Sequence, residues 1–148
     1  MAFKAAANQG IAINADLQMQ QRKMVNGFFK PVGGLLPVAP HSVPDAPTTL
    51  SYFLLGILAD DPNNDGIPAI VNAITGMQRE DGSWAGMAPR PPLSTATDLD
   101  ATSIAVIALT QSGRAKKGTI ANAVQWLRMQ KTSVATSRAL RLWALGAA

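Results

Sequence analysis

Two kinds of hydrophobic pattern alternate along the second half of the chain. Residues 65–77 and residues 119–131 each place apolar side chains at helical spacing with polar residues between them, which predicts helices with one face in water. Residues 48–59 and 98–111 are apolar nearly all round, which indicates helices buried on most sides. A further helix is predicted over 134–145. This order of inner and outer helices predicts an all-α protein made of stacked helix pairs in a double layer.

The first third of the chain has a different pattern. Residues 5–29 lack proline and carry one stripe, which predicts a single long helix; the stripe is Leu17, Gln21, Met24, Val25 and Phe28. Five of the ten prolines lie in residues 31–47, which predicts an extended connector. We therefore divide the chain into an N-terminal helix (1–30), a proline-rich connector (31–47) and a helical repeat domain (48–148). The first helix and the connector form a candidate docking arm, and we expect essentially no sheet.

Composition excludes several classes of site. The 148 residues fit one domain, 47% of them are apolar, and there is no cysteine and a single histidine, His41. Disulfides, thiolate metal sites and multi-histidine metal centres are thereby excluded, and we expect no metal and no cofactor. No secretory signal is visible, and the longest apolar run, residues 50–59, has about half the length of a membrane span. We therefore expect a soluble protein, cytoplasmic by default, that at most touches a membrane surface.

Charge is distributed unevenly. Residues 45–100 carry eight acids and two bases, whereas residues 101–148 carry seven bases and no acid. Such a segment can meet phosphate or an acidic protein surface, or it can be a solvated face spread over two helices. Neither an RNA-binding aromatic signature nor zinc-finger spacing accompanies these bases, so we do not expect a nucleic-acid partner. The seven bases are Arg114, Lys116, Lys117, Arg128, Lys131, Arg138 and Arg141.

Two stretches look like copies of one unit. Residues 70–84 read IVNAITGMQREDGSW and residues 119–130 read TIANAVQWLRMQ, so that Gln78 and Gln130 stand 52 positions apart. Each glutamine ends a predicted outer helix, and a period near fifty residues indicates stacked helix pairs. The second copy has Trp126 ahead of its glutamine but no Gly-x-Trp after it.

The first copy ends in Gln78, then Gly82-Ser83-Trp84, and this pattern resembles the QW motif of the squalene–hopene cyclase and terpenoid cyclase superfamily. That resemblance implies an α/α toroid in which the glutamine satisfies helix-end backbone groups, packs on the tryptophan and ties outer helices together. The residue types suit such a turn: a helix end leaves carbonyls unpaired, Gly82 permits the turn, and Trp84 supplies a large apolar face with one donor.

The resemblance covers about residues 48–148. Arg90-Pro91-Pro92-Leu93, and Thr97-Asp98 leading into an apolar helix, look similar to bacterial squalene-cyclase-like repeat proteins of unassigned activity. Five or six helices are too few to close a ring, so the resemblance implies a partial toroid. An arc exposes a concave wall and two ends. We therefore expect a non-catalytic scaffold or binding subunit that docks a protein partner or a second copy, with contact to an apolar ligand left open.

An enzymatic alternative depends on Asp98 and Asp100. Asp98-Leu99-Asp100 resembles the Asp-x-Asp-Asp motif of class II terpene cyclases, which implies Asp100 as the acid acting on an isoprenoid, with Asp98 as its neighbour. The pattern departs from that motif at Ala101. Acids in the first turn of a helix also stabilise its N-terminus, and Thr97 has capping-box spacing to Asp100. We predict capping, and we lean against an enzyme.

The remaining candidates have structural explanations. His41 beside Ser42 has no indicated catalytic partner and is predicted to be a hydrogen-bonded loop residue. Residues 60–66 resemble part of a calcium loop but lack the closing glutamate, so we predict a turn with Asp65 as the N-cap of the next helix. Trp126 and Trp143 are predicted to be core residues.

Overall fold

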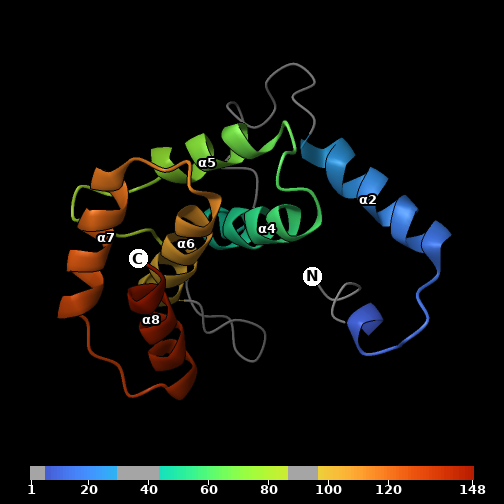
Figure 1. Cartoon of the computed structure of the whole chain (residues 1–148). Helices are drawn as coiled ribbons and strands as arrows, with labels where there is room; N and C mark the ends of the chain where they lie inside the picture. The colour runs from blue at the N-terminus through green and yellow to red at the C-terminus, as the bar shows by residue number, and fades with distance from the viewer. Residues whose placement is uncertain (1–5, 30–43, 87–96) are drawn as a thin grey trace.

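The computed structural model describes residues 6–29, 44–86 and 97–148, and these residues contain helices and no strand (Figure 1). The all-α prediction is thus confirmed. None of the helices in these ranges combines the length and hydropathy that a membrane span requires. The helices are α2 (Ala15–Phe29), α4 (Ala46–Asp60), α5 (Ile67–Gly76), α6 (Asp98–Ser112), α7 (Lys117–Met129) and α8 (Ala135–Ala147).

Helix α6 is the centre of the packed part of the molecule (Figure 1). It packs against α4 on one side and α8 on the other, while α5 lies on α4 and α7 lies on α6. Every residue from 99 to 109 is buried, as the apolar pattern predicted for this segment. The helix ends where Gly113 adopts the left-handed conformation, at φ 62°. By their contacts, α4, α6 and α8 form one layer, and α5 and α7 lie beside it.

Helix α8 is much less buried than α4 and α6, the other two helices of its layer. Only Ser137 and Ala144 are buried in it, whereas Leu142 and Trp143 are 60% and 52% exposed. The prediction that Trp143 is a core residue is therefore wrong. The reason is positional, because α8 is the last helix of its layer and no described element covers the side that faces away from α6. Trp126, in contrast, is partly buried and packs against the core.

The single helix predicted over residues 5–29 is also wrong. A short helical turn ends near residue 8, Gly10 adopts φ 76°, and the backbone is irregular as far as Asn14. The Asn14 side-chain oxygen then accepts hydrogen bonds from the amides of Asp16 (3.0 Å) and Leu17 (3.1 Å), which starts α2. Glycine and asparagine thus break the helix locally, since no described helix packs closely on this segment to override their preferences.

Two apolar residues of the predicted α2 stripe, Leu17 and Met24, are exposed. Leu17 is 48% exposed and Met24 is 69% exposed, and Figure 1 shows α2 standing apart from the packed helices. Residues 31–43 of the predicted connector, with His41, and the segment 87–96, with Arg90-Pro91-Pro92-Leu93, lie outside the described residues. The last connector residues, Ala46 and Pro47, are instead the buried first turn of α4, where proline is well tolerated.

The loop between α4 and α5 is a turn, as predicted, but Asp65 is not its cap. Gly66 precedes the helix, and its amide donates to the Asn64 side-chain oxygen at 3.0 Å. The Asp61 carboxylate accepts from the amide of Asn63 at 3.2 Å. The Asn64 side chain thus closes a turn inside the loop, while the N-cap of α5 is Gly66 and no side chain caps this helix. Across the described residues, no three acidic or histidine side chains gather closely enough to hold a metal ion.

Candidate binding surfaces

The turn after α5 joins two outer helices. The Gln78 side-chain amide donates to the carbonyl of Gly82 at 3.0 Å and to the carbonyl of Thr119 at 2.9 Å. Thr119 lies in the first turn of α7, forty-one positions further along the chain. One side chain therefore holds the exit of α5 against the start of α7.

Trp84 satisfies the end of α5, the role that the resemblance implied for Gln78. Its side chain is fully buried, and its indole N–H donates to the Ile74 carbonyl in the last turn of α5 at 2.6 Å. Its backbone amide donates to the Thr102 hydroxyl of α6 at 2.9 Å. Trp84 thus links α5 to the central helix, because an indole offers a large apolar body and a single donor.

Gly82 permits α7 to approach this turn closely. Its φ is 90°, a conformation that side-chain-bearing residues rarely adopt. A Cβ built at this position would lie 2.6 Å from the carbonyl oxygen of Asn122 on α7. The turn therefore requires glycine both for its backbone angle and for the space available.

Asp81 organises the same turn from its outer side. Its carboxylate accepts hydrogen bonds from the Ser83 hydroxyl at 2.7 Å and from the Ser83 amide at 2.9 Å. These bonds lower the pKa of Asp81; Arg79 and the Trp126 side chain lower it further, while burial opposes the shift. Trp126, from the second sequence copy, thus acts on the turn of the first copy.

Asp98 and Asp100 both have structural partners. The Asp100 carboxylate accepts from the amide (3.1 Å) and hydroxyl (3.0 Å) of Thr97, and the Thr97 hydroxyl accepts from the Asp100 amide, which confirms the predicted capping box. Asp98 pairs with Arg79 and accepts from the Gly86 amide at 2.8 Å. Both carboxylates thus take part in structural contacts at the start of α6, and one buried oxygen of Asp100 has no hydrogen-bond partner among the described residues.

Gln130 makes no bridge comparable to that of Gln78. Its amide donates at 3.3 Å to the carbonyl of Trp126, within its own helix. Arg141 of α8 closes the end of α7 instead, donating to the carbonyl of Leu127 at 2.7 Å and to that of Arg128 at 3.2 Å. A guanidinium suits this position because the C-terminus of a helix carries partial negative charge. The sequence analysis placed Arg141 only among the bases and missed this role.

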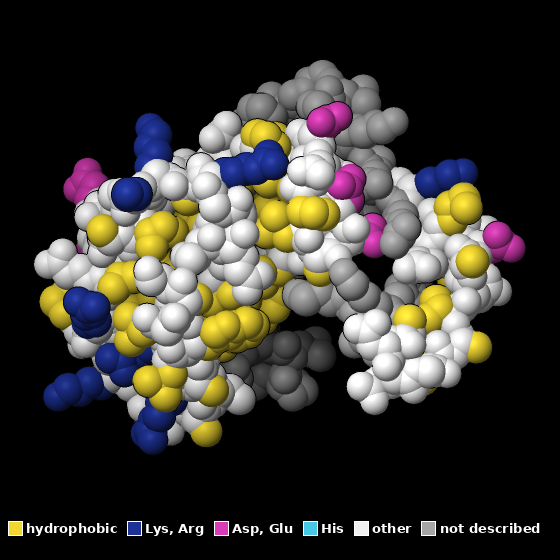
Figure 2. Space-filling model, in the orientation of Figure 1, with side chains coloured by type: hydrophobic (Ala, Val, Ile, Leu, Met, Phe, Trp, Pro, Cys, Tyr) yellow, Lys and Arg dark blue, Asp and Glu magenta, His cyan; other side chains and the backbone are white. Residues whose placement is uncertain are grey.

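The seven bases fall into two groups along the chain, one before and at the start of α7 and one from the end of α7 into α8. On the face shown in Figure 2, Lys and Arg side chains lie at several separate places. None of the seven makes an ion pair with an acidic side chain in the described ranges. Arg114 donates to the carbonyl of Pro62 at 3.5 Å, and Arg138 donates to that of Thr132 at 3.4 Å. The first group is Arg114, Lys116 and Lys117, and the second is Arg128, Lys131, Arg138 and Arg141.

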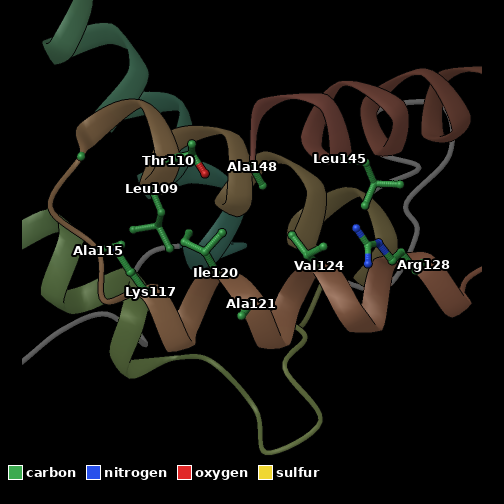
Figure 3. Close-up of a pocket in the computed structure, with 11 residues that line it drawn as sticks. Leu109, Thr110, Ala115, Lys117, Ile120, Ala121, Val124, Arg128, Leu145 and Ala148 are labelled. Atoms are coloured by element: carbon green, nitrogen blue, oxygen red, sulfur yellow. The ribbon is translucent and has the colours of Figure 1, made fainter.

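A groove runs along α7 where the ends of α6 and α8 approach it (Figure 3). Its volume is about 530 Å³. Ile120 and Val124 form the α7 wall, Leu109 comes from α6, and Leu145 comes from α8. The Thr110 hydroxyl, from another lining residue, is buried and has no hydrogen-bond partner among the described residues.

Lys117 and Arg128 stand at the two ends of the groove. With Ile120 and Val124 they follow one another at intervals of three or four residues, which places all four on one face of α7. That spacing was the available sequence signal for the groove. It was missed because the opposite wall comes from α6 and α8.

A second surface is the outward side of α8. We define the α8 surface as Leu142 and Trp143, two neighbouring residues of α8 that are 60% and 52% exposed. In the orientation of Figure 1, Figure 2 shows apolar and basic side chains next to one another over the region of α8. Exposed apolar side chains that gather in this way mark interaction sites more often than isolated ones do.

Comparison with known proteins supplies no relative on which to base a function. No family model matches this chain, and neither the curated proteins nor the solved structures contain a match. The described surfaces and their chemistry therefore carry the functional argument.

Proposed function

We propose that this chain is a non-catalytic helical scaffold whose α8 surface docks an acidic α-helix of a partner protein. The exposure of Leu142 and Trp143 carries the proposal. The neighbouring helix α6 buries its apolar residues between α4 and α8, so a further helix packed on α8 would continue the same layer.

The fold-level part of the proposal is a partial α/α toroid similar to the squalene-cyclase-like repeats. Its support is the order of contacts, in which α6 lies between α4 and α8 while α5 and α7 pack beside this layer. The Gln78 bridge from the exit of α5 to the start of α7 supports it further, since it joins consecutive outer helices. Among the described helices, α8 is the outermost of this layer, and its packing partners are α6 and α7.

Charge argues for an acidic partner over a second copy. Residues 101–148 hold seven bases and no acid; Arg138 and Arg141 lie on α8 itself, and Lys131 lies in the segment that precedes it. Two α8 surfaces facing each other would oppose like charges, whereas glutamates beside the apolar stripe of a partner helix would meet these bases. The occupant is therefore an amphipathic helix with an acidic border.

The test uses two synthetic helical peptides that share the same leucine–alanine stripe. In the first peptide glutamates flank the stripe, and in the second lysines flank it. Binding is measured by fluorescence anisotropy on wild type, on Leu142→Ser with Trp143→Ser, and on Tyr52→Ser. Tyr52 is the matched control, because it is an exposed aromatic (54%) on α4 at the other side of the layer.

We expect wild type and Tyr52→Ser to bind the glutamate-flanked peptide, and the α8 double variant to lose at least tenfold in affinity. Added salt should weaken the binding, since the bases of the protein and the glutamates of the peptide are exposed to solvent. Equal binding of the two peptides would contradict the acidic partner. A dimer in sedimentation that dissociates in the double variant would assign the surface to a second copy.

The cyclase alternative gains no support from the described contacts. Asp100 caps α6 through Thr97, and Asp98 is held by Arg79 and the Gly86 amide. We expect Asp100→Asn to lower the free energy of unfolding by about 1 kcal/mol, because it removes a negative charge from the N-terminus of α6 and weakens the charge-assisted bonds from Thr97.

A further inference from the structure

The groove along α7 combines an apolar wall with unpaired positive charge. Ile120, Val124 and Leu145 face it, and Figure 3 shows the Arg128 guanidinium turned into the space between Val124 and Leu145. Its volume of about 530 Å³ falls within the range of small-molecule sites, roughly 300–1,000 Å³. Arg128 makes no ion pair within the described residues, so its charge is available to a ligand.

We propose that this groove binds a single-chain anionic amphiphile, with the carboxylate or phosphate head at Arg128 and the apolar chain along α7. A planar guanidinium offers paired donors that match a carboxylate or phosphate, which fixes the head group at that end. The chain then covers Val124 and Ile120 and ends near Leu109. This site is separate from the α8 surface, and the proposal does not depend on a partner protein.

The form of the groove favours a free amphiphile over a membrane surface. Its apolar side chains lie between helices, where one chain can enter, and they do not project outward as a face that could lie on a bilayer. A cation also stands at the far end of the groove, since Lys117 lines it there. Because Lys117 and Arg128 stand at the two ends, the apolar lining is confined to the stretch between them. A groove of this form suits a ligand with a short apolar chain.

The experiment is calorimetric titration of the full chain with decyl phosphate and decanoate, each below its micelle concentration. Decanol, decyltrimethylammonium and inorganic phosphate are titrated as controls for the head group and the chain. Two variants remove one positive charge each, Arg128→Gln and Lys131→Gln. Arg128 lines the groove, whereas Lys131 lies two residues beyond the end of α7 and does not line the groove. Val124→Phe fills the groove, and its folding is verified by circular dichroism.

We expect decyl phosphate and decanoate to bind with one-to-one stoichiometry, and inorganic phosphate and decyltrimethylammonium to bind at least tenfold more weakly. Arg128→Gln should weaken decyl phosphate at least tenfold, while Lys131→Gln should change its affinity less than twofold. Val124→Phe should weaken decyl phosphate and decanol alike. In heteronuclear NMR spectra, decyl phosphate should shift the amides of residues 120–128, a readout that does not require the filled variant to fold.

Three results would overturn the proposal. Equal losses in Arg128→Gln and Lys131→Gln would show that the chain attracts anions without a site. Binding of decyltrimethylammonium as tight as that of decyl phosphate would remove the role of the guanidinium. Co-flotation with phosphatidylglycerol vesicles without any binding of the monomeric amphiphiles would assign the basic end of α7 to a membrane surface.

Discussion

The exits of α5 and α7 carry similar sequences and have different contacts. After α5, Gln78 reaches the start of another helix, and Trp84 is fully buried against the carbonyl end of its own helix. After α7, Gln130 bonds only within α7, and the exit is closed by Arg141 from α8. Both helix exits thus have a glutamine, but only the glutamine after α5 forms a bridge to another helix.

The difference shows what makes the first exit a junction. Its turn contains Gly82, which lets the α7 backbone approach, and Trp84, which fills the space between α5 and α6. The turn at the second exit has neither residue, and among the described contacts its glutamine reaches no other helix. A glutamine connects outer helices only where another outer helix begins beside it.

Removing Trp84 should have the largest effect on this comparison. Trp84→Ala leaves a cavity under α5 and α6 and removes the indole donor, so we expect a loss of about 4 kcal/mol in the free energy of unfolding. Urea titration followed by circular dichroism measures this loss. Trp143→Ala is the control, because Trp143 is half exposed, and its cost should stay below about 0.5 kcal/mol. Equal losses in the free energy of unfolding for Trp84→Ala and Trp143→Ala would show that Trp84 does not stabilise the junction between α5 and α6.

Gly82→Ala should be the next most destabilising change. It places a side chain at φ 90° and within 2.6 Å of the Asn122 carbonyl, and we expect a loss of about 3 kcal/mol from strain and crowding. Gly118→Ala is matched to it, because a Cβ there meets nothing within 4 Å and lies in a helix. The free energy of unfolding of Gly118→Ala should be about 0.5 kcal/mol higher than that of wild type. A neutral Gly82→Ala would show that α7 does not pack on this turn.

Gln78→Ala and Gln130→Ala compare the two glutamines directly. The first substitution leaves the Gly82 and Thr119 carbonyls without their donor in a partly buried place, and we expect a loss of about 1.5 kcal/mol. The second removes a bond within one helix and should cost less than about 0.5 kcal/mol. Thermal unfolding of both variants in one buffer provides the measurement. A larger cost at Gln130 would reverse the assignment of the junction.

The smallest expected effect is the pH dependence due to Asp81. Its folded-state pKa is lowered, chiefly by hydrogen bonds from Ser83, below the value of about 3.9 for a free aspartate. The stabilisation is therefore complete above the unfolded-state pKa and is lost as the pH falls through the folded-state pKa. Urea midpoints at pH 6 and pH 3 should differ less in Asp81→Asn than in wild type. An unchanged difference would assign the acid sensitivity to other carboxylates.

Local patterns predicted much of the fold. The apolar run of residues 98–111 and its Thr97–Asp100 box predicted a buried helix with a defined start, since periodicity and capping act between residues a few positions apart. The predicted helix over 5–29 failed at Gly10 and Asn14, where local preferences have no tertiary packing against them. Asp65 failed as a cap because α5 begins one residue later, with Gly66 as an N-cap that has no side chain. The toroid and the partner helix remain predictions.

The sequence by itself determined the all-helical class, the buried central helix and the concentration of bases in the last third, because each follows from composition or from spacing within one helix. Only the tertiary structure decided that Gln78 meets Thr119, that Trp143 is exposed at the end of a layer, and that Arg128 faces an apolar groove. These outcomes depend on which helices lie side by side, and contacts between distant segments are fixed by packing and not by local pattern.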